Sequence, residues 1–271
     1  MEEVLHRACG IAVEAARFAG TLIRERFGGP FRAWEKGDFG DVVTEVDEQA
    51  EKEIIRRIRR HFPDHAIRGE ETGRSGEAGD WLWMVDPLDE ANHFAIGLPL
   101  CAVSITLLHR DEPVLGVICD AHLDQIYVAR KGKGAFCGER RLRAGAGGKP
   151  PGKMTLGWIQ GHQVQKDPVA ARLRERLDQG VKRVLRLWAP SLLWCMLARG
   201  IWTGLCCTIR WGRISTPVCS WRRRPGCGPW ILRAVPLTGS RQPPIFWPAA
   251  RRIGRRFAVW FFGKGMTHVK P

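Results

Sequence analysis

Three carboxylates stand at the ends of two short strand-like segments and are the residues best placed for chemistry. Glu70 follows the segment 65–69, and Asp86 and Asp89 follow the apolar segment 81–85. Carboxylate oxygens gathered at strand ends are hard ligands of the kind that Mg²⁺ prefers. The sequence therefore points first to a cation site built from these three side chains.

The spacing of Asp86 and Asp89 supports this interpretation. Pro87 has a fixed φ and favours an extended conformation at the residue before it, so Asp86, the carbonyl oxygen of Leu88 and Asp89 can turn towards a common point. Mg²⁺ keeps several waters and takes one or two carboxylates together with a substrate phosphate. Two plainer alternatives stay open: the tetrapeptide forms a turn in which Asp89 caps a helix, and the acidic pair at 70–71 is a solvated charge pair.

The elements that must position these carboxylates follow from periodicity. Apolar residues at spacings of three and four predict helices over residues 2–27 and 47–61, with a polar, glycine-containing loop at 36–41 between them. Short segments separated by turn residues predict consecutive strands. These strands are 65–69, 81–85, 102–108, 114–119, 125–128 and 135–136. Such a mixture predicts helix layers packed on sheets.

A segment rich in glycine and proline at 144–153 predicts a connector between two halves. Residues 1–145 form the expected N-terminal half, which holds the carboxylates. Residues 154–200 begin a second half, with helices and a strand. These are a helix at 168–177, a strand at 181–187 and a helix at 190–198.

The composition changes abruptly near residue 200. The chain of 271 residues carries a net charge of +15, and residues 201–271 hold 13 Lys and Arg but no Asp or Glu. The same tail contains six of the twelve Trp and eight of the seventeen Pro. Average usage would place roughly eight or nine acidic residues there. The tail is therefore a different kind of sequence from the first 200 residues.

Cysteine usage and the N-terminus favour a cytoplasmic protein. Nine cysteines occur without a Cys-x-x-Cys pair, which speaks against a zinc or redox motif. The start, Met1-Glu2-Glu3, lacks the basic and then apolar pattern of a signal peptide. The longest mostly apolar run, 97–108, is too short to span a bilayer. We expect no membrane partner.

Several motifs in a fixed order resemble the inositol monophosphatase family. Residues 40–47, 62–71 and 83–89 read GDVVTEVD, FPDHAIRGEE and WMVDPLD, and similar shorter motifs follow at 97–99, 116–118 and 131–136. The resemblance covers roughly residues 1–200. It implies an α/β fold, a layered α/β/α/β/α sandwich of the inositol monophosphatase and fructose-1,6-bisphosphatase type, whose second half is incomplete or disordered after about residue 200.

The resemblance also implies an activity and a site. The activity is Mg²⁺-dependent, lithium-sensitive hydrolysis of a small phosphomonoester by a metal-activated water. Glu70, Asp86, Asp89 and the carbonyl of Leu88 match the metal-ligand positions, and the three carboxylates are the catalytic candidates. Acidic residues near an outer metal match Asp41 and Asp47; their plainer roles are a loop carboxylate and a helix cap. A homodimer is usual for the family.

Two residues of the phosphate loop depart from the family pattern. Glu90 stands in place of a glycine whose backbone approaches the phosphate, where a carboxylate would repel the anion and strain the backbone. Ala91 stands in place of a threonine that supports the attacking water. His93 replaces an asparagine, and we expect a structural role for it. These changes predict weakened phosphate binding.

The larger departure is the absence of the family's second acidic motif. No Asp or Glu remains after residue 200 to complete the metal site. Regrouping the codons by one base turns Trp202-Thr203 into Asp and Trp211-Gly212 into Gly, and places an Asp codon at Ile214. The regrouped stretch 200–226 is compatible with the missing family segment. We therefore hypothesise a shift of reading frame near residue 200.

The sequence thus predicts a phosphatase of the inositol monophosphatase type, impaired as written. Inositol phosphate or a similar sugar phosphate is the expected partner. Fructose 1,6-bisphosphate and 3′-phosphoadenosine 5′-phosphate are alternative substrates. An alternative of another class is a non-catalytic protein whose basic tail binds nucleic acid or an anionic membrane, which is disfavoured because the tail has no repeated module. We expect no nucleic-acid partner.

Overall fold

The fold is seen in a computed structural model, in which the described residues are 1–36, 41–142, 150–160, 166–201, 204–209 and 258–259. The chain divides into two compact units. The first contains residues 1–142 and 189–195, and the second is built on residues 143–188 and 196–214. The connector predicted at 144–153 lies largely outside the described residues. Each unit is a sheet with helices against it, so the predicted α/β class is confirmed.

Two long helices of the first unit confirm the helices predicted from periodicity. They are α1 (Glu2–Arg26) and α2 (Glu45–His61). The helix α2 begins two residues earlier than predicted because Thr44 caps it. The Thr44 hydroxyl accepts the Val46 and Asp47 N–H groups, while the Asp47 carboxylate accepts the Thr44 N–H. This reciprocal capping box fixes the start of the helix.

An eight-stranded sheet forms the body of the first unit, in the order β10-β9-β8-β7-β6-β5-β3-β4. Its strands are β3 (Ala66–Gly69), β4 (Gly73–Ser75), β5 (Trp81–Asp89), β6 (Ala102–His109), β7 (Glu112–Asp120), β8 (Gln125–Arg130), β9 (Gly134–Cys137) and β10 (Arg140–Arg141). The strands predicted between 65 and 136 are confirmed. The pair β3 and β5 is parallel, whereas the other neighbours are antiparallel.

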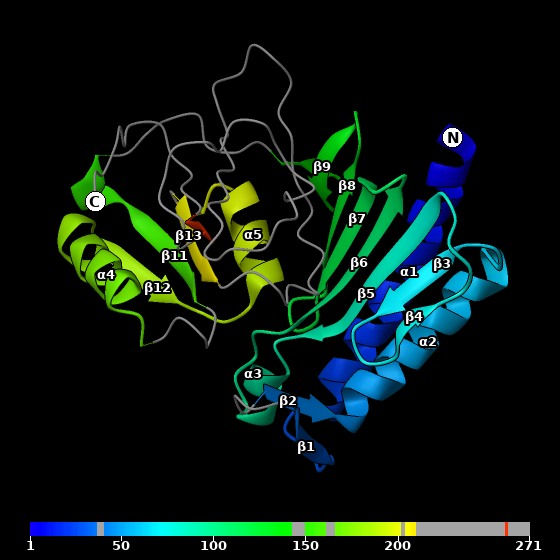
Figure 1. The fold of residues 1–271 in the computed structure, drawn as a ribbon, viewed down its shortest axis with the longest axis horizontal. Helices are drawn as coiled ribbons and strands as arrows, with labels where there is room; N and C mark the ends of the chain where they lie inside the picture. The colour runs from blue at the N-terminus through cyan, green and yellow to red at the C-terminus, as the bar shows by residue number, and fades with distance from the viewer. Residues whose placement is uncertain (37–40, 143–149, 161–165, 202–203, 210–257, 260–271) are drawn as a thin grey trace. The chain divides into compact units, whose positions relative to one another are not determined.

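A hairpin of two short strands lies outside this sheet. β1 (Ala33–Lys36) pairs antiparallel with β2 (Asp41–Thr44), and Lys36 stands opposite Asp41. The loop predicted at 36–41 is thus flanked by strands at both ends, and its residues 37–40 lie outside the described part. β2 leads directly into α2, which places the hairpin at the start of that helix (Figure 1).

The helices α1 and α2 cover one face of the large sheet (Figure 1). Alanines along α1, from Ala8 to Ala19, are fully buried and let the helix approach its neighbours closely. Trp83 of β5 and Ile54 of α2 are fully buried in the same core. Because successive residues of a strand point to opposite faces, the neighbours of these core positions must be covered from the other side.

The helix α5 (Pro190–Ala198) supplies that cover through residues 189–195, which belong to the first unit. Side chains of this segment form a second apolar cluster with the opposite face of the sheet. The cluster contains Ala102, Ile118, Tyr127, Ala189, Leu192 and Cys195. The predicted helix at 190–198 is therefore confirmed, and its first turn packs on the unit that carries the carboxylates.

The second unit has a smaller sheet in the order β12-β11-β13-β14. Its strands are β11 (Thr155–Gln160), β12 (Arg183–Arg186), β13 (Gly204–Ile209) and β14 (Ala258–Val259). The helix α4 (Pro168–Gly180) follows β11, and Leu177 packs with Trp158. β13 lies beyond residue 200, where the composition changes, and pairs in parallel with β11. No helix of the described residues is long and apolar enough to cross a membrane.

Candidate functional site

The end of β5 carries Asp86 and Asp89. The pairing of β5 with β6 is regular up to Asp86, opposite Ser104, and is then irregular until Asp89 stands opposite Ala102. Such an irregularity redirects side chains and is frequent beside active sites. The two carboxylates are only 2% and 5% exposed. The tetrapeptide therefore continues a buried strand instead of forming an exposed turn.

Glu70 lies beside Asp86 because β3 and β5 run in parallel. Gly69 stands opposite Val85, and the Glu70 N–H donates to the Val85 carbonyl at 3.1 Å. The carboxyl groups of Glu70 and Asp86 are hydrogen-bonded to each other. The structure thus brings two of the three predicted carboxylates into direct interaction.

Burial controls the protonation of all three carboxylates. It raises the pKa of Glu70, and the hydrogen bond from Asp86 opposes this rise. Burial, followed by the charges of Glu70 and Asp89, raises the pKa of Asp86 well above its usual range. Burial also raises the pKa of Asp89 to about 7. A divalent cation among these groups would stabilise their ionised forms.

Asp89 is also tied to the start of α5. Its Oδ2 accepts the Ser191 N–H at 2.7 Å, and this hydrogen bond partly offsets the rise of its pKa. The short helix that follows it, α3 (Ala91–Ala95), has Glu90 and not Asp89 as its N-cap. Asp89 therefore does cap a helix, as the plainer alternative predicted, but the helix is α5, about a hundred residues further along the chain, and not α3.

The donor set suits a hard cation that keeps part of its water shell. Within the described ranges, no three Asp, Glu, His or Cys side chains converge closely enough to hold a metal by themselves. Asp86 Oδ1 is buried and has no hydrogen-bond partner among the described atoms. A buried oxygen without a partner costs free energy that a cation would recover. Mg²⁺ needs only one or two carboxylates, and the Leu88 carbonyl remains a predicted further ligand.

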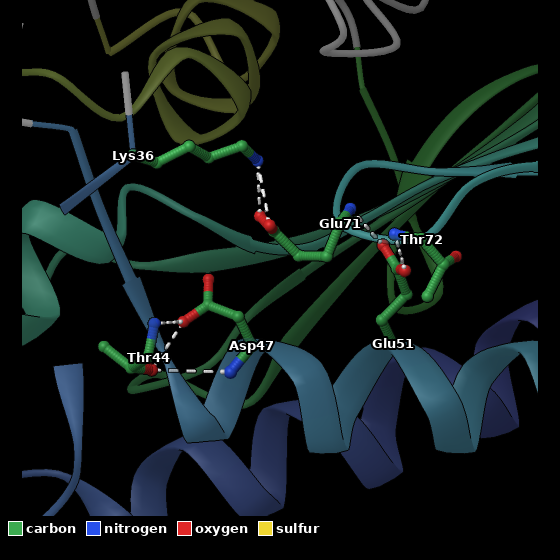
Figure 2. Close-up of polar contacts among 6 residues, drawn as sticks. All are labelled: Lys36, Thr44, Asp47, Glu51, Glu71 and Thr72. Atoms are coloured by element: carbon green, nitrogen blue, oxygen red, sulfur yellow. Dashed lines mark hydrogen bonds and ion pairs between the residues drawn. The ribbon is translucent and has the colours of Figure 1, made fainter. Parts of the chain in front are cut away.

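Asp47 forms part of the capping box of α2, which is the helix-cap role predicted from the sequence as its plainer alternative. Its Oδ2 accepts both the N–H and the hydroxyl of Thr44, and burial raises its pKa to about 7. Figure 2 shows its other oxygen turned towards the side on which Lys36 and Glu71 lie. Asp41 is exposed at the start of β2. A role of either residue at an outer metal stays a prediction.

Glu90 occupies a backbone conformation that suits glycine. Its φ of 82° and ψ of 60° lie in the left-handed region. Burial is the largest cause that raises the pKa of its carboxyl group, to about 9, and the Asp89 charge adds to it. Ala91 follows, nearly buried, at the first position of α3. The ring of His93 contacts the Leu100 carbonyl at 3.0 Å, in keeping with the structural role predicted for it.

Two acidic residues near Glu70 were not identified from the sequence as functional. Glu71 is not merely a solvated charge, because both of its carboxylate oxygens accept from Lys36, at 2.8 and 2.9 Å (Figure 2). Glu51 of α2 is fully buried, and its carboxylate accepts two backbone N–H groups of the turn after Glu70. Its spacing of four from Asp47 places both on one helix face, which is the signal that could have found it.

Comparisons with known proteins show which family the chain resembles. The model of the inositol monophosphatase family matches residues 5–206. A relative from Aquifex aeolicus named fructose-1,6-bisphosphatase/inositol-1-monophosphatase is 34% identical over 143 residues, 52% of this chain and 54% of its own length. A relative from Haemophilus influenzae named Nus factor SuhB is 40% identical over 136 residues, 49% of this chain and 51% of its own length. The chain thus spans about half the length of the curated relatives it matches.

A solved structure extends the likeness over more of the chain. The extragenic suppressor protein SuhB from Bartonella henselae superposes with a TM-score of 0.70 at 27% identity, over 75% of this chain and 79% of its own. The family match covers the helices α1 and α2, the large sheet and the carboxylates at its edge. On these grounds the chain belongs to the inositol monophosphatase family.

Proposed function

We propose that this chain is a Mg²⁺-dependent phosphomonoesterase that acts on inositol phosphate or a similar small sugar phosphate. The observation that carries the proposal is the interacting pair of Glu70, which is partly buried, and Asp86, which is buried and has an oxygen without a hydrogen-bond partner among the described atoms. Clustered carboxylates with raised pKa values are typical of catalytic sites. The family and the names of the relatives give the reaction class.

The chain's own residues would divide the work. Glu70, Asp86, Asp89 and the Leu88 carbonyl would hold the cation, and the hydrogen bond from Ser191 would fix the orientation of Asp89. Glu70 would orient the attacking water and accept its proton, since a carboxylate with a raised pKa is a better base near neutral pH. Bound Mg²⁺ supplies a water of lowered pKa and charge stabilisation at the phosphate.

We also propose that the phosphate loop of this chain is impaired. A helix N-terminus next to a substrate phosphate normally presents backbone N–H groups to it. Glu90 places a buried carboxyl group there, and Ala91 has no hydroxyl with which to support the water. We expect weak phosphate binding even when the cation is held.

The reading-frame hypothesis belongs to the same proposal. The family match ends at residue 206, close to where acidic residues disappear from the sequence. A one-base shift near residue 200 would account for the tail and for an Asp codon at the position of Ile214. Sequencing the coding DNA tests this: a frame that is intact through residue 226 would refute the shift.

The partners remain proposals as well. The names of the relatives leave inositol phosphate and fructose 1,6-bisphosphate as alternatives, and 3′-phosphoadenosine 5′-phosphate is a third. We propose a cytoplasmic enzyme that forms a homodimer. Because one relative is named Nus factor SuhB, the absence of a nucleic-acid partner stays a prediction. Nucleic-acid binding by the basic tail would be strongly salt-dependent and would vanish on deletion of residues 201–271.

Phosphate release tests the proposed activity. The full chain and a frame-corrected version are incubated with each of the three substrates, with Mg²⁺ or with EDTA. We expect slow Mg²⁺-dependent release from the full chain, faster release from the corrected chain, and none from Glu70→Gln or Asp86→Asn in either. If the corrected chain releases no phosphate from any substrate, the proposed function is wrong.

A further inference from the structure

Glu51 holds the turn that follows Glu70. It is a fully buried residue of α2, and its Oε2 accepts the Glu71 N–H at 2.9 Å while its Oε1 accepts the Thr72 N–H at 2.8 Å. Figure 2 shows the carboxylate reaching from the helix to these two amides. They are the two N–H groups directly after Glu70 in the chain. One side chain of the helix therefore fixes the turn between β3 and β4.

Gly69 makes room for this carboxylate on the other side of Glu70. A Cβ atom at Gly69 would lie 2.5 Å from Cδ and Oε1 of Glu51 and 2.6 Å from Oε2, closer than such atoms approach in proteins. Its φ lies outside the left-handed region, so the position needs glycine for space and not for conformation. The Glu51 carboxylate thus packs on the backbone before Glu70 and hydrogen-bonds to the backbone after it.

We propose that Glu51 is a positioning residue for Glu70. The Glu70 N–H is fixed by the Val85 carbonyl, and the next two amides are fixed by Glu51. These three hydrogen bonds determine the backbone from which the Glu70 side chain reaches Asp86. The proposal rests on the proposed function, because it assigns Glu51 the task of holding Glu70 ready to bind the cation.

A purely structural role would not require a charged group here. Burying a carboxylate is costly, and the two amide donors offset that cost only while the turn keeps its present conformation. Glutamine would keep an oxygen for one amide, but it would turn an NH₂ group towards the other. Glu51 therefore stabilises one conformation of the turn, as residues that hydrogen-bond to metal ligands fix the orientation of those ligands.

Mn²⁺ binding and amide exchange test this role in the full chain. Glu51→Gln is compared with Glu48→Gln, which makes the same change at an exposed site of the same helix. We expect Glu51→Gln to weaken Mn²⁺ binding, followed by electron paramagnetic resonance, about 10- to 100-fold. Hydrogen exchange at the Glu71 and Thr72 amides should be faster in this variant. Glu48→Gln should match the wild type in both measurements.

A second variant keeps the carboxylate but moves it. Gly69→Ala displaces the intact Glu51 side chain and should also weaken Mn²⁺ binding, so the inference can be tested even if Glu51→Gln does not fold. If the wild type binds Mn²⁺ and the folded variants bind it equally well, Glu51 is only structural and the inference is wrong. If the wild type itself binds no Mn²⁺, the proposed function fails and the inference falls with it.

Discussion

Replacing Glu90 should stabilise this protein, although the residue is largely buried. Two separate costs meet at this position: the left-handed backbone, with φ of 82°, and a carboxyl group whose pKa is raised by burial to about 9 from its ordinary 4.5. Glu90→Gln removes the ionisable group and keeps the backbone cost. Glu90→Gly removes both.

The structure gives the magnitude of each cost. At pH 7 the Glu90 carboxyl group is protonated in the folded protein and ionised in the unfolded chain. Since each pKa unit corresponds to about 1.4 kcal/mol, this difference destabilises the folded state by about 3 kcal/mol. The left-handed conformation adds about 1 kcal/mol. Because the folded pKa is raised, the first cost grows as the pH rises above 4.5 and is small at pH 5.

Urea unfolding followed by tryptophan fluorescence measures both effects. At pH 7 we expect Glu90→Gln to raise the free energy of unfolding by up to about 3 kcal/mol, and Glu90→Gly by about 1 kcal/mol more. At pH 5 the advantage of Glu90→Gln should fall below about 1 kcal/mol, while the difference between the two variants should persist. Equal stability of wild type and both variants at pH 7 would refute the reasoning.

Further predictions concern the cap, the metal-free site and the surface ion pair. Thr44→Ala should lower the free energy of unfolding by about 1 kcal/mol, because it removes the capping box of α2; unchanged urea unfolding would contradict this. In EDTA, Asp89→Asn should be more stable than the wild type at pH 7.5, with an advantage that shrinks towards pH 5. Burial raises the folded pKa of Asp89 from 3.8 to about 7, so the wild type loses stability as the pH rises from 3.8 to about 7. Thermal unfolding at the two pH values measures this, and an advantage that does not change with pH would contradict it. Lys36→Ala should cost less than about 1 kcal/mol in urea unfolding, since Lys36 is 45% exposed in its pair with Glu71; a loss of several kcal/mol would show that the pair is worth more than an exposed ion pair.

Periodicity was sufficient to predict the long helices and the central strands, because their signals are local. The buried stripe of α1 and the mostly apolar strands β6 and β7 can be recognised from neighbouring residues alone. The extent of β5 was not predictable in this way, since Asp86-Pro87 resembles a turn. Only pairing with β6, across an irregular register, shows that the strand continues to Asp89.

Part of the site could be predicted, because Glu70 and Asp86 follow segments whose strand pattern is local. The parallel pairing of β3 and β5 brings Glu70 to Asp86, as a site of strand-end carboxylates requires. Glu51 was not predicted because its partners are backbone amides some twenty residues away, and its spacing of four from Asp47 indicates a shared helix face but not those partners. The hairpin of β1 and β2 was missed because its turn is polar and contains two glycines, as unstructured loops often do.

The location of a bound cation tests the central claim most directly. Crystals of the full chain, or of its frame-corrected form, are soaked in Mn²⁺ and measured at a wavelength where manganese scatters anomalously. We predict an anomalous peak among the carboxylates of Glu70, Asp86 and Asp89, and no such peak in Asp86→Asn. A Mn²⁺ ion bound elsewhere, or no peak between these side chains at saturating Mn²⁺, would contradict the account.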